Sequence, residues 1–165
     1  MLEDIVIRDA TTDDWARIND IYNWTIVDNH VSFDLDPFTL ETRRQWWDAR
    51  SPELDCLVAE VDGHVIGVTY SSWYRPKLAY RSTVETTIVL DTDHLARGLG
   101  SRLLGALLER LRQRGLHMAV AIVALPNEGS IALHHKLGYT TVGVVHEAGF
   151  KLGRYWDIEI LELRL

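Results

Sequence analysis

Residues 84–101 read Val84-Glu85-Thr86-Thr87-Ile88-Val89-Leu90-Asp91-Thr92-Asp93-His94-Leu95-Ala96-Arg97-Gly98-Leu99-Gly100-Ser101. A run of strand-forming residues carrying one carboxylate is followed by an acidic turn, and glycines then open a Leu-rich helix. The start of a helix leaves several backbone N–H groups without an intrahelical acceptor, at the positive end of the helix dipole. This stretch therefore predicts a strand, an anion-binding turn made of peptide groups, and a helix.

The composition predicts one acidic globular domain. The chain has 165 residues, of which 47% are hydrophobic and 25% charged, so we expect residues 1–165 to form a single domain. The net charge of −7 argues against nucleic acid or an anionic membrane as a partner. The N-terminus lacks the basic and apolar regions of a signal peptide, and no apolar run reaches transmembrane length. We therefore expect a cytoplasmic protein.

The cysteine and the histidines give no sign of a disulfide or a metal site. Cys56 is the single cysteine and lies in an apolar, strand-like run, which favours a buried small side chain over a reactive thiol. The histidines have no HExxH spacing, and the adjacent His134 and His135 cannot share one helix face. We expect no metal.

Hydrophobic periodicity and turn signals divide the chain into strands and helices. Strands are expected at residues 5–8, 57–61, 65–70, 84–90, 118–124, 139–145 and 155–165. Helices are expected from Thr11 or Thr12, from about Thr39, over residues 99–114 and from Pro126-Asn127. Residues 71–82 are expected to form a loop rich in aromatic and basic side chains. This order predicts an α/β fold with a mixed sheet.

The last expected strand changes the side on which its apolar residues fall. Trp156, Ile158 and Ile160 alternate with polar residues, and beyond them the apolar positions are Leu161, Leu163 and Leu165. Because successive strand residues point to opposite faces, this change predicts a bulge near Ile160 or a strand buried on both faces.

The chain resembles the GNAT superfamily of N-acetyltransferases. The cofactor loop of that superfamily follows a Gln/Arg-x-x-Gly-x-Gly/Ala pattern, and the corresponding frame here runs from Leu95 to Gly100, with Leu95 at the Gln/Arg position. A narrower resemblance, to phosphinothricin and methionine sulfoximine N-acetyltransferases, covers nearly the whole chain. Its motifs are Ile21-Tyr22-Asn23, Val31-Ser32-Phe33-Asp34, Val84-Glu85-Thr86, Ala124-Leu125-Pro126-Asn127, Leu133-His134, Leu137-Gly138-Tyr139 and Gly149-Phe150-Lys151.

The resemblance implies a fold and an activity. The implied fold is a mixed, mostly antiparallel sheet flanked by helices, with a splayed pair of strands at the cofactor site. The implied reaction moves an acetyl group from acetyl-coenzyme A (acetyl-CoA) to the α-amine of a small amino-acid-like acceptor, in a ternary complex and without an acyl-enzyme. Members of this family are commonly homodimers. The implied cofactor-binding residues are Ile88, Val89, Leu90, Ala96, Arg97, Gly98, Leu99, Gly100 and Ser101, and the implied acceptor-binding residues are Phe33, Arg75, Lys77 and Tyr80.

Glu85 and His134 are the candidates for proton transfer. An amine with a pKa near ~10 is only about 0.1% neutral at pH 7, so a base must remove a proton before the nitrogen can attack. Glu85 lies in an otherwise apolar and Thr-rich strand, where desolvation raises the pKa of a carboxyl. The alternative is a carboxylate that faces solvent or pairs with Arg81. His134 stands where the superfamily usually has a tyrosine acid, and it is either an acid, a second base, or a histidine on the helix surface.

Polar groups near these two residues have candidate roles as well. A backbone N–H of residues 88–90 is placed to stabilise the oxyanion that forms during acyl transfer. Asn127 is expected either to cap its helix alone or to cap it and also contact the pantetheine arm, and Ser130 is expected to reach the cofactor. Two other functions remain open at this point: an acetyltransferase that acts on a protein amine, and a non-catalytic CoA-binding module.

Overall fold

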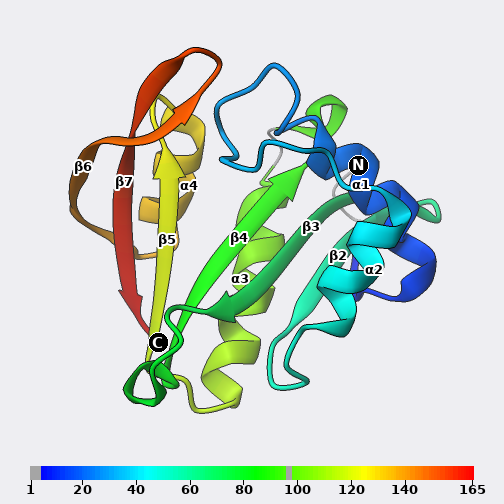
Figure 1. Cartoon of the computed structure of the whole chain (residues 1–165). Helices are drawn as coiled ribbons and strands as arrows, with labels where there is room; N and C mark the ends of the chain where they lie inside the picture. Colours follow the sequence, from blue (N-terminus) through cyan, green and yellow to red (C-terminus); the bar gives the residue numbers. More distant parts are fainter. Residues whose placement is uncertain (1–4, 96–97) are drawn as a thin grey trace.

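The structure is a computed structural model and describes residues 5–95 and 98–165. The described residues form a seven-stranded sheet in the order β1-β2-β3-β4-β5-β7-β6 (Figure 1). Its strands are β1 (Val6–Asp9), β2 (Cys56–Val61), β3 (His64–Trp73), β4 (Thr83–Leu90), β5 (Met118–Ala124), β6 (Thr140–Lys151) and β7 (Arg154–Arg164). Within this sheet β4 and β5 are parallel, and every other pairing is antiparallel.

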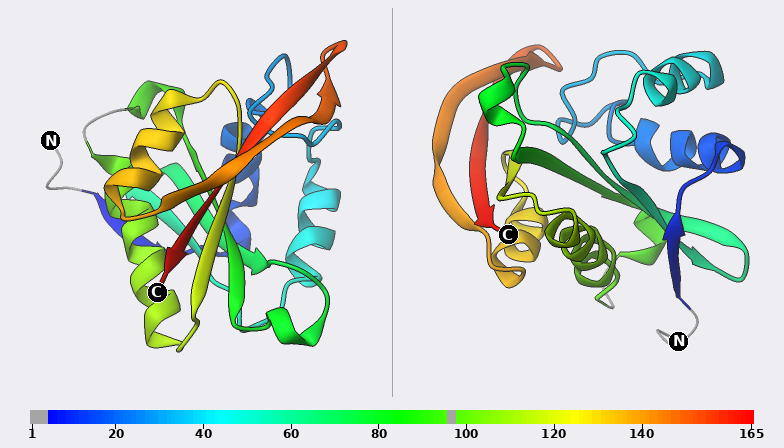
Figure 2. Two further views of the ribbon diagram at one scale, coloured as in Figure 1. Left: turned by 90° about the vertical axis from the view of Figure 1, so that its left-hand side faces the viewer. Right: turned by 90° about the horizontal axis from the view of Figure 1, so that it is seen from below.

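Helices cover both faces of the sheet, as the right-hand view of Figure 2 shows. Helices α1 (Trp15–Asn23) and α2 (Leu40–Asp48) lie on one face, and α3 (Leu99–Gln113) and α4 (Glu128–Lys136) lie on the other. Three short 3₁₀ turns, η2 (Thr12–Asp14), η3 (Leu78–Tyr80) and η4 (Thr92–His94), complete the described elements. The expected α/β fold with a mixed, mostly antiparallel sheet is confirmed. Across the described ranges, no helix is both long enough and apolar enough to span a bilayer.

Helix α3 follows from the Leu repeat of the sequence. Leu99, Leu103, Leu107 and Leu111 fall on one face of the helix and are all buried against the sheet. Gly98 takes the left-handed conformation at the N-cap, with φ of 77°, so the chain turns sharply from β4 into this helix. The predicted strand–turn–helix unit is therefore present.

The parallel pair β4–β5 separates partway along its length. Its ladder consists of Thr83 with Met118, Val84 with Ala119, and Glu85 with Val120, and no further pairing of these two strands is recorded. Beyond Glu85 the two strands diverge, which is visible between the arrowheads of β4 and β5 in Figure 1. The expected splayed pair is thus confirmed, and it leaves backbone N–H and C=O groups free of a sheet partner at the centre of the molecule.

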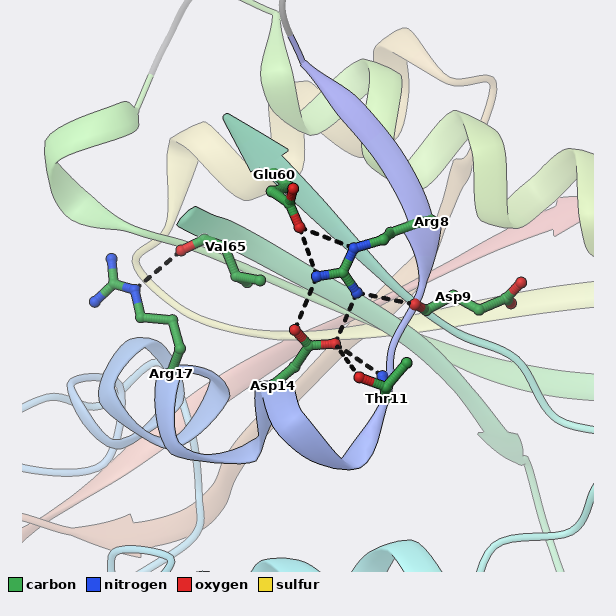
Figure 3. Close-up of polar contacts among 7 residues, drawn as sticks. All are labelled: Arg8, Asp9, Thr11, Asp14, Arg17, Glu60 and Val65. Atoms are coloured by element: carbon green, nitrogen blue, oxygen red, sulfur yellow. Dashed lines mark hydrogen bonds and ion pairs between the residues drawn. The ribbon is translucent and has the colours of Figure 1, made fainter. Parts of the chain in front are cut away.

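A partly buried ion-pair network fixes the start of α1 against the sheet (Figure 3). The Arg8 guanidinium donates to both carboxylate oxygens of Asp14, at 2.8 and 2.9 Å, and to Glu60 of β2 at 2.6 Å. Asp14 in turn accepts from the backbone N–H of Thr11 at 2.8 Å. Arg17 of α1 donates to the Val65 carbonyl of β3 at 2.9 Å. These contacts hold the start of α1 against strands β1, β2 and β3.

Two strands are longer than the periodicity indicated. β3 continues through Trp73, inside the expected loop 71–82, and β6 continues to Lys151. Neither extension shows clean apolar alternation. Both are held by hydrogen-bonded pairing with the neighbouring strand, β4 or β7, and not by burial of one face. The bulge expected near Ile160 lies in the partner strand, where the register of β6 shifts between Thr141 and Gly143, opposite Leu161 and Ile160.

Candidate active site

A cleft of about 1150 Å³ opens where β4 and β5 separate. It runs from the aromatic side chains of α1 and α2, past Glu85, to the N-terminus of α3 and one face of α4. The residues of β4 from Glu85 to Leu90 line it on one side, and those of β5 from Ala121 to Ala124 line it on the other. The fold thus places strand β4, the glycine turn at the start of α3 and helix α4 around one cavity.

Glu85 and His134 reach this cleft from opposite faces of the sheet. Glu85 pairs with Ser72, and its face also carries Tyr70, which packs with the α1/α2 side. The neighbouring Thr86 points the other way, since its hydroxyl lies 2.8 Å from the Tyr139 hydroxyl on the α3/α4 side. His134 belongs to α4 and contacts Tyr139, so it lies on that second side.

Glu85 is half-buried, and burial raises the pKa of its carboxyl. Arg81 does not pair with the Glu85 carboxylate. Its guanidinium lies over the Trp73 ring instead, 4.6 Å from the ring centroid. Glu85 therefore lines the cleft as a carboxylate whose affinity for a proton is increased by desolvation.

The protonation state of His134 follows from its contacts. Its side chain is almost fully buried, with 3% exposed, and burial lowers the pKa of the imidazole. Nδ1 lies 2.7 Å from the Ser130 carbonyl oxygen, which can only accept, so Nδ1 carries the hydrogen. The neutral ring then presents a lone pair at Nε2. His135 is exposed, and its Nδ1 donates to the Tyr139 carbonyl at 3.0 Å.

The N-terminus of α3 faces the cofactor end of the cleft. Arg102 makes the first i→i−4 hydrogen bond of the helix, to the Gly98 carbonyl at 3.1 Å, so the N–H groups of Leu99, Gly100 and Ser101 precede the helical ladder. Gly98, Gly100 and Ser101 line the cleft, whereas Leu99 is buried in the core beside them. The expected cofactor residues on β4, Ile88, Val89 and Leu90, also line it. Ala96 and Arg97 lie outside the described residues.

Gly100 allows a close contact between helices and strand. A Cβ at this position would lie 3.0 Å from Leu133 Cδ2 of α4 and 3.4 Å from Leu90 Cδ1 of β4. The absence of a side chain therefore brings the start of α3 against two residues that line the cleft.

Asn127 and Ser130 lie where α4 begins. The Asn127 side-chain oxygen accepts from the Ser130 backbone N–H at 3.2 Å and so caps the helix, as expected. Both residues line the cleft. The cap orients α4 so that Ser130 and His134, one turn apart, face the same cavity.

The four expected acceptor residues are not brought together within one chain. Phe33 lines the cleft, but Arg75, Lys77 and Tyr80 do not. They belong to residues 74–82, which join β3 to β4 at the end of the sheet opposite the splay, near the C-terminus in Figure 1. Because β3 and β4 are antiparallel, the loop that joins them lies at the start of β4, and the cleft opens toward the end of β4. An acceptor-binding role of these three residues stays a prediction.

Much of the cleft wall on the α1/α2 side is formed by residues that no predicted site contained. This wall is aromatic with one further carboxylate, and consists of Tyr22, Phe38, Trp46, Tyr70 and Asp34. The Tyr22 hydroxyl donates to Asp34 at 2.8 Å. Arg43, only 1% exposed, lies behind the wall with its guanidinium carbon 4.0 Å from the Phe38 ring centroid. The sequence motifs gave Trp46 no role, and the motif Ile21-Tyr22-Asn23 did not by itself place Tyr22 in a cleft.

Cys56 does not line the cleft. It is buried in β2, as expected, and burial raises the pKa of its thiol to about 11. Among the described residues, no group of three or more His, Cys, Asp or Glu side chains is arranged to hold a metal ion.

The chain is similar in sequence to known acetyltransferases. The model of the Acetyltransferase (GNAT) family matches residues 18–139. The chain is 35% identical to a phosphinothricin N-acetyltransferase of Streptomyces coelicolor over 159 residues, 94% of this chain and 93% of that protein. It is 38% identical to an L-methionine sulfoximine/L-methionine sulfone acetyltransferase of Pseudomonas paraeruginosa over 162 residues, 96% of this chain and 94% of that protein.

A solved structure shares the whole fold. A GNAT superfamily phosphinothricin acetyltransferase from Sinorhizobium meliloti, crystallised in complex with acetyl-CoA, superposes with a TM-score of 0.93 at 29% identity, covering 98% of this chain and 89% of that one. The splayed strands, the glycine turn at α3 and the cleft between them match what such a cofactor requires. This chain accordingly belongs to the GNAT family and is an acetyl-CoA-dependent N-acetyltransferase.

Proposed function

We propose that this enzyme transfers the acetyl group of acetyl-CoA to the amine of a small amino-acid-like acceptor of the phosphinothricin or methionine sulfoximine type. The names of the relatives support this acceptor class. The single observation that carries the chemistry is Glu85, a half-buried carboxylate of raised pKa on the acceptor side of the splay. Acetyl-CoA supplies a thioester, an acyl group activated toward attack by a neutral amine.

Glu85 acts as the base in this proposal, directly or through a water molecule. An acceptor enters as an ammonium, which has no lone pair, so its proton passes to the Glu85 carboxylate before the nitrogen bonds to the acyl carbon. The raised pKa of Glu85 brings the affinity of the base for the proton closer to that of the amine. The aromatic side chains of the wall exclude water from the same end of the cleft.

His134 acts on the second proton of the amine and on the leaving thiolate. A neutral imidazole with its hydrogen on Nδ1 cannot donate from Nε2, so His134 is not an acid in its resting state. Its Nε2 accepts a proton as the amine bonds to the acyl carbon, and then returns it to the departing thiolate. The position of His134 on the α3/α4 side, away from Glu85, supports this division of roles.

The cofactor is held mainly by peptide groups. The N–H groups of Leu99, Gly100 and Ser101 at the positive end of α3 suit the diphosphate, and the backbone of Ile88–Leu90, free of β5, suits the pantetheine arm. Asn127 and Ser130 border the same channel. A diphosphate needs no net positive protein charge in such a site, which agrees with the acidic composition.

We expect Gly100→Val to weaken acetyl-CoA binding by about tenfold or more, since overpacking costs ~1–3 kcal/mol and here displaces Leu133 and Leu90 at the cofactor end. Calorimetric titration with acetyl-CoA measures the effect. Gly105→Ala in the same helix is the control, because a Cβ there meets only Leu137 at an ordinary 3.8 Å. Unchanged affinity in Gly100→Val would mean that this end of α3 does not contact the cofactor.

We also propose that residues 1–165 form a single domain that works in the cytoplasm as a homodimer, without nucleic acid or membrane as a partner. The net charge of −7 supports the exclusion of anionic partners. The exposed apolar side chains of β6 and β7 support association of two copies. They are Val142, Val144, Val145, Phe150 and Tyr155.

Thiol release from acetyl-CoA tests the acceptor class. The panel contains methionine sulfoximine, methionine sulfone, phosphinothricin, common amino acids, and a peptide with a free N-terminus and a lysine. We expect release with one of the small amino-acid analogues, and acetylation at its α-amine by mass spectrometry. Release with the peptide alone would instead favour a protein amine as the acceptor. Binding of acetyl-CoA without release by any amine would favour a non-catalytic CoA-binding module.

A further inference from the structure

A strap of chain, residues 29–38, crosses from the end of α1 toward the tip of the β6–β7 hairpin (Figure 1). It carries Phe33 and Asp34, which line the acceptor end of the cleft. The strap begins on the half of the sheet formed by β1 to β4 and reaches the half formed by β5 to β7. It therefore spans the two halves that the splay separates.

Lys151, the last residue of β6, holds the strap by its backbone. Its side chain is buried, with 6% exposed, and Nζ donates to the Ser32 carbonyl at 2.6 Å. The neighbouring residue of the strap is Phe33, so this contact fixes the backbone from which the Phe33 ring projects.

Gly149 receives the Phe33 ring. A Cβ at residue 149 would lie 2.3, 2.6 and 2.8 Å from three atoms of that ring, and these are the three nearest atoms. Separations below 3.0 Å are not tolerated, so any side chain at this position displaces the ring. The ring is 38% exposed and thus has room to move, which makes displacement of Phe33 less costly than disruption of the sheet.

A third contact anchors the start of the strap. The His30 ring stacks on the Trp156 ring of β7, with centroids 4.4 Å apart and planes within 13°. Nε2 of His30 also lies 2.9 Å from the Pro126 carbonyl, just before α4. The strap is thus tied to β6, to β7 and to the approach to α4.

We propose that Gly149 and Lys151 are positioning residues for acceptor specificity, which hold Phe33 over the acceptor end of the cleft. This inference rests on the proposed function, because it concerns the acceptor half of that same site. Neither residue touches the reacting atoms. Gly149 leaves the space that the Phe33 ring occupies, and Lys151 holds the peptide group that joins Ser32 to Phe33.

The test is Gly149→Ala, with Gly143→Ala as its matched control in the same strand. At residue 143 a Cβ meets nothing within 4 Å. We expect Gly149→Ala to raise KM for the acceptor by about tenfold, because small displacements of positioning groups carry losses of that size, and to leave KM for acetyl-CoA unchanged. Gly143→Ala should leave both constants unchanged. Lys151→Met should repeat the split between the two KM values, and Lys151→Arg should restore part of it.

A double-mutant cycle with Phe33→Ala identifies the contact. If the ring transmits the effect, Gly149→Ala adds nothing further in the Phe33→Ala background. An effect of equal size in both backgrounds, or an equal rise in KM for acetyl-CoA, overturns the proposal.

Hydrogen exchange of residues 29–38 gives a readout that needs no acceptor. We expect Gly149→Ala, and not Gly143→Ala, to lose protection there. Unchanged protection overturns the inference even if every amine is acetylated. If Gly149→Ala loses protection but the wild-type enzyme acetylates none of the amines, the proposed acceptor class is overturned. The inference that Gly149 positions Phe33 is then retained.

Discussion

Glu85→Gln should lower kcat by about 10²–10⁴-fold, the range that a positioned base typically contributes. Glutamine keeps the size of the side chain and removes its ability to accept the proton of an ammonium. Because Glu85 faces the α1/α2 side and not the N-terminus of α3, acetyl-CoA affinity should be unchanged. Steady-state kinetics with a saturating acceptor, together with calorimetric titration of acetyl-CoA, measures both quantities.

Glu109→Gln is the matched control for this substitution. Glu109 is exposed on α3, and its contacts with described residues lie in its own helix: it accepts from Gln113 at 3.1 Å and pairs with Arg112 at 3.7 Å. The Glu109→Gln substitution removes the same charge as Glu85→Gln and should leave kcat unchanged. If Glu85→Gln lost turnover and acetyl-CoA affinity by the same factor, Glu85 would not be the base.

The raised pKa of Glu85 also makes the stability of the folded protein depend on pH. The folded protein binds this proton more tightly than the unfolded chain, whose carboxyl has the ordinary value of 4.5. The stability contributed by protonated Glu85 is therefore complete below pH 4.5 and is lost as pH rises through the higher pKa of the folded state. Thermal denaturation should give Glu85→Gln a Tm at or above that of wild type at pH 8, with a difference that shrinks toward pH 4.

His134→Asn should lower kcat by about 10²-fold, at the lower end of what one acid–base group contributes. The asparagine amide can still donate to the Ser130 carbonyl, as Nδ1 does at 2.7 Å, but it has no equivalent of Nε2. Both KM values should change little, because the substitution leaves the Asn127 cap of α4 in place. Single-turnover measurements at saturating acetyl-CoA isolate the chemical step.

His135→Asn provides the control, since His135 is the next residue, is exposed, and bonds to the Tyr139 carbonyl through the same ring nitrogen. Its kcat should equal that of wild type. The pKa of His134 lies below 6.5, so its own titration should not shape the rate above pH 7. The limb that Glu85 contributes to the pH profile should persist in His134→Asn and disappear in Glu85→Gln. Full activity of His134→Asn would exclude Nε2 from the proton path.

Local patterns were sufficient for most elements of the fold. The Leu-rich helix α3, the glycine turn before it and the helix that starts near Thr39 depend on residues close in sequence, and the structure has each of them. The ends of β3 and β6 were wrong because their last residues are held by cross-strand pairing, which leaves no periodic signal. The bulge was expected in β7 and lies in β6, since two paired strands share one irregularity.

The candidate site divides in the same way. The cofactor end is formed by residues 88–90 of β4, by the described start of α3 and by α4. The motifs placed most of these described residues in the cleft, because they lie close together in sequence. The acceptor end is assembled from α1, α2, β3 and the strap, which are far apart in sequence. Arg75, Lys77 and Tyr80 were assigned there by resemblance, and the antiparallel course of β3 and β4 places them at the other end of the sheet.

The sequence by itself determined that a strand bearing Glu85 leads through a glycine turn into a helix, because these elements arise from steric and hydrogen-bonding preferences of neighbouring residues. It also predicted an anion-binding turn made of peptide groups, because the overall charge of the chain is −7 and offers no general attraction for a phosphate. Only the tertiary structure decided that Glu85 and His134 approach from opposite faces, that His134 is neutral with Nε2 free, and that Gly149 meets Phe33. These depend on strand register, desolvation and contacts between segments more than a hundred residues apart, which no local pattern records.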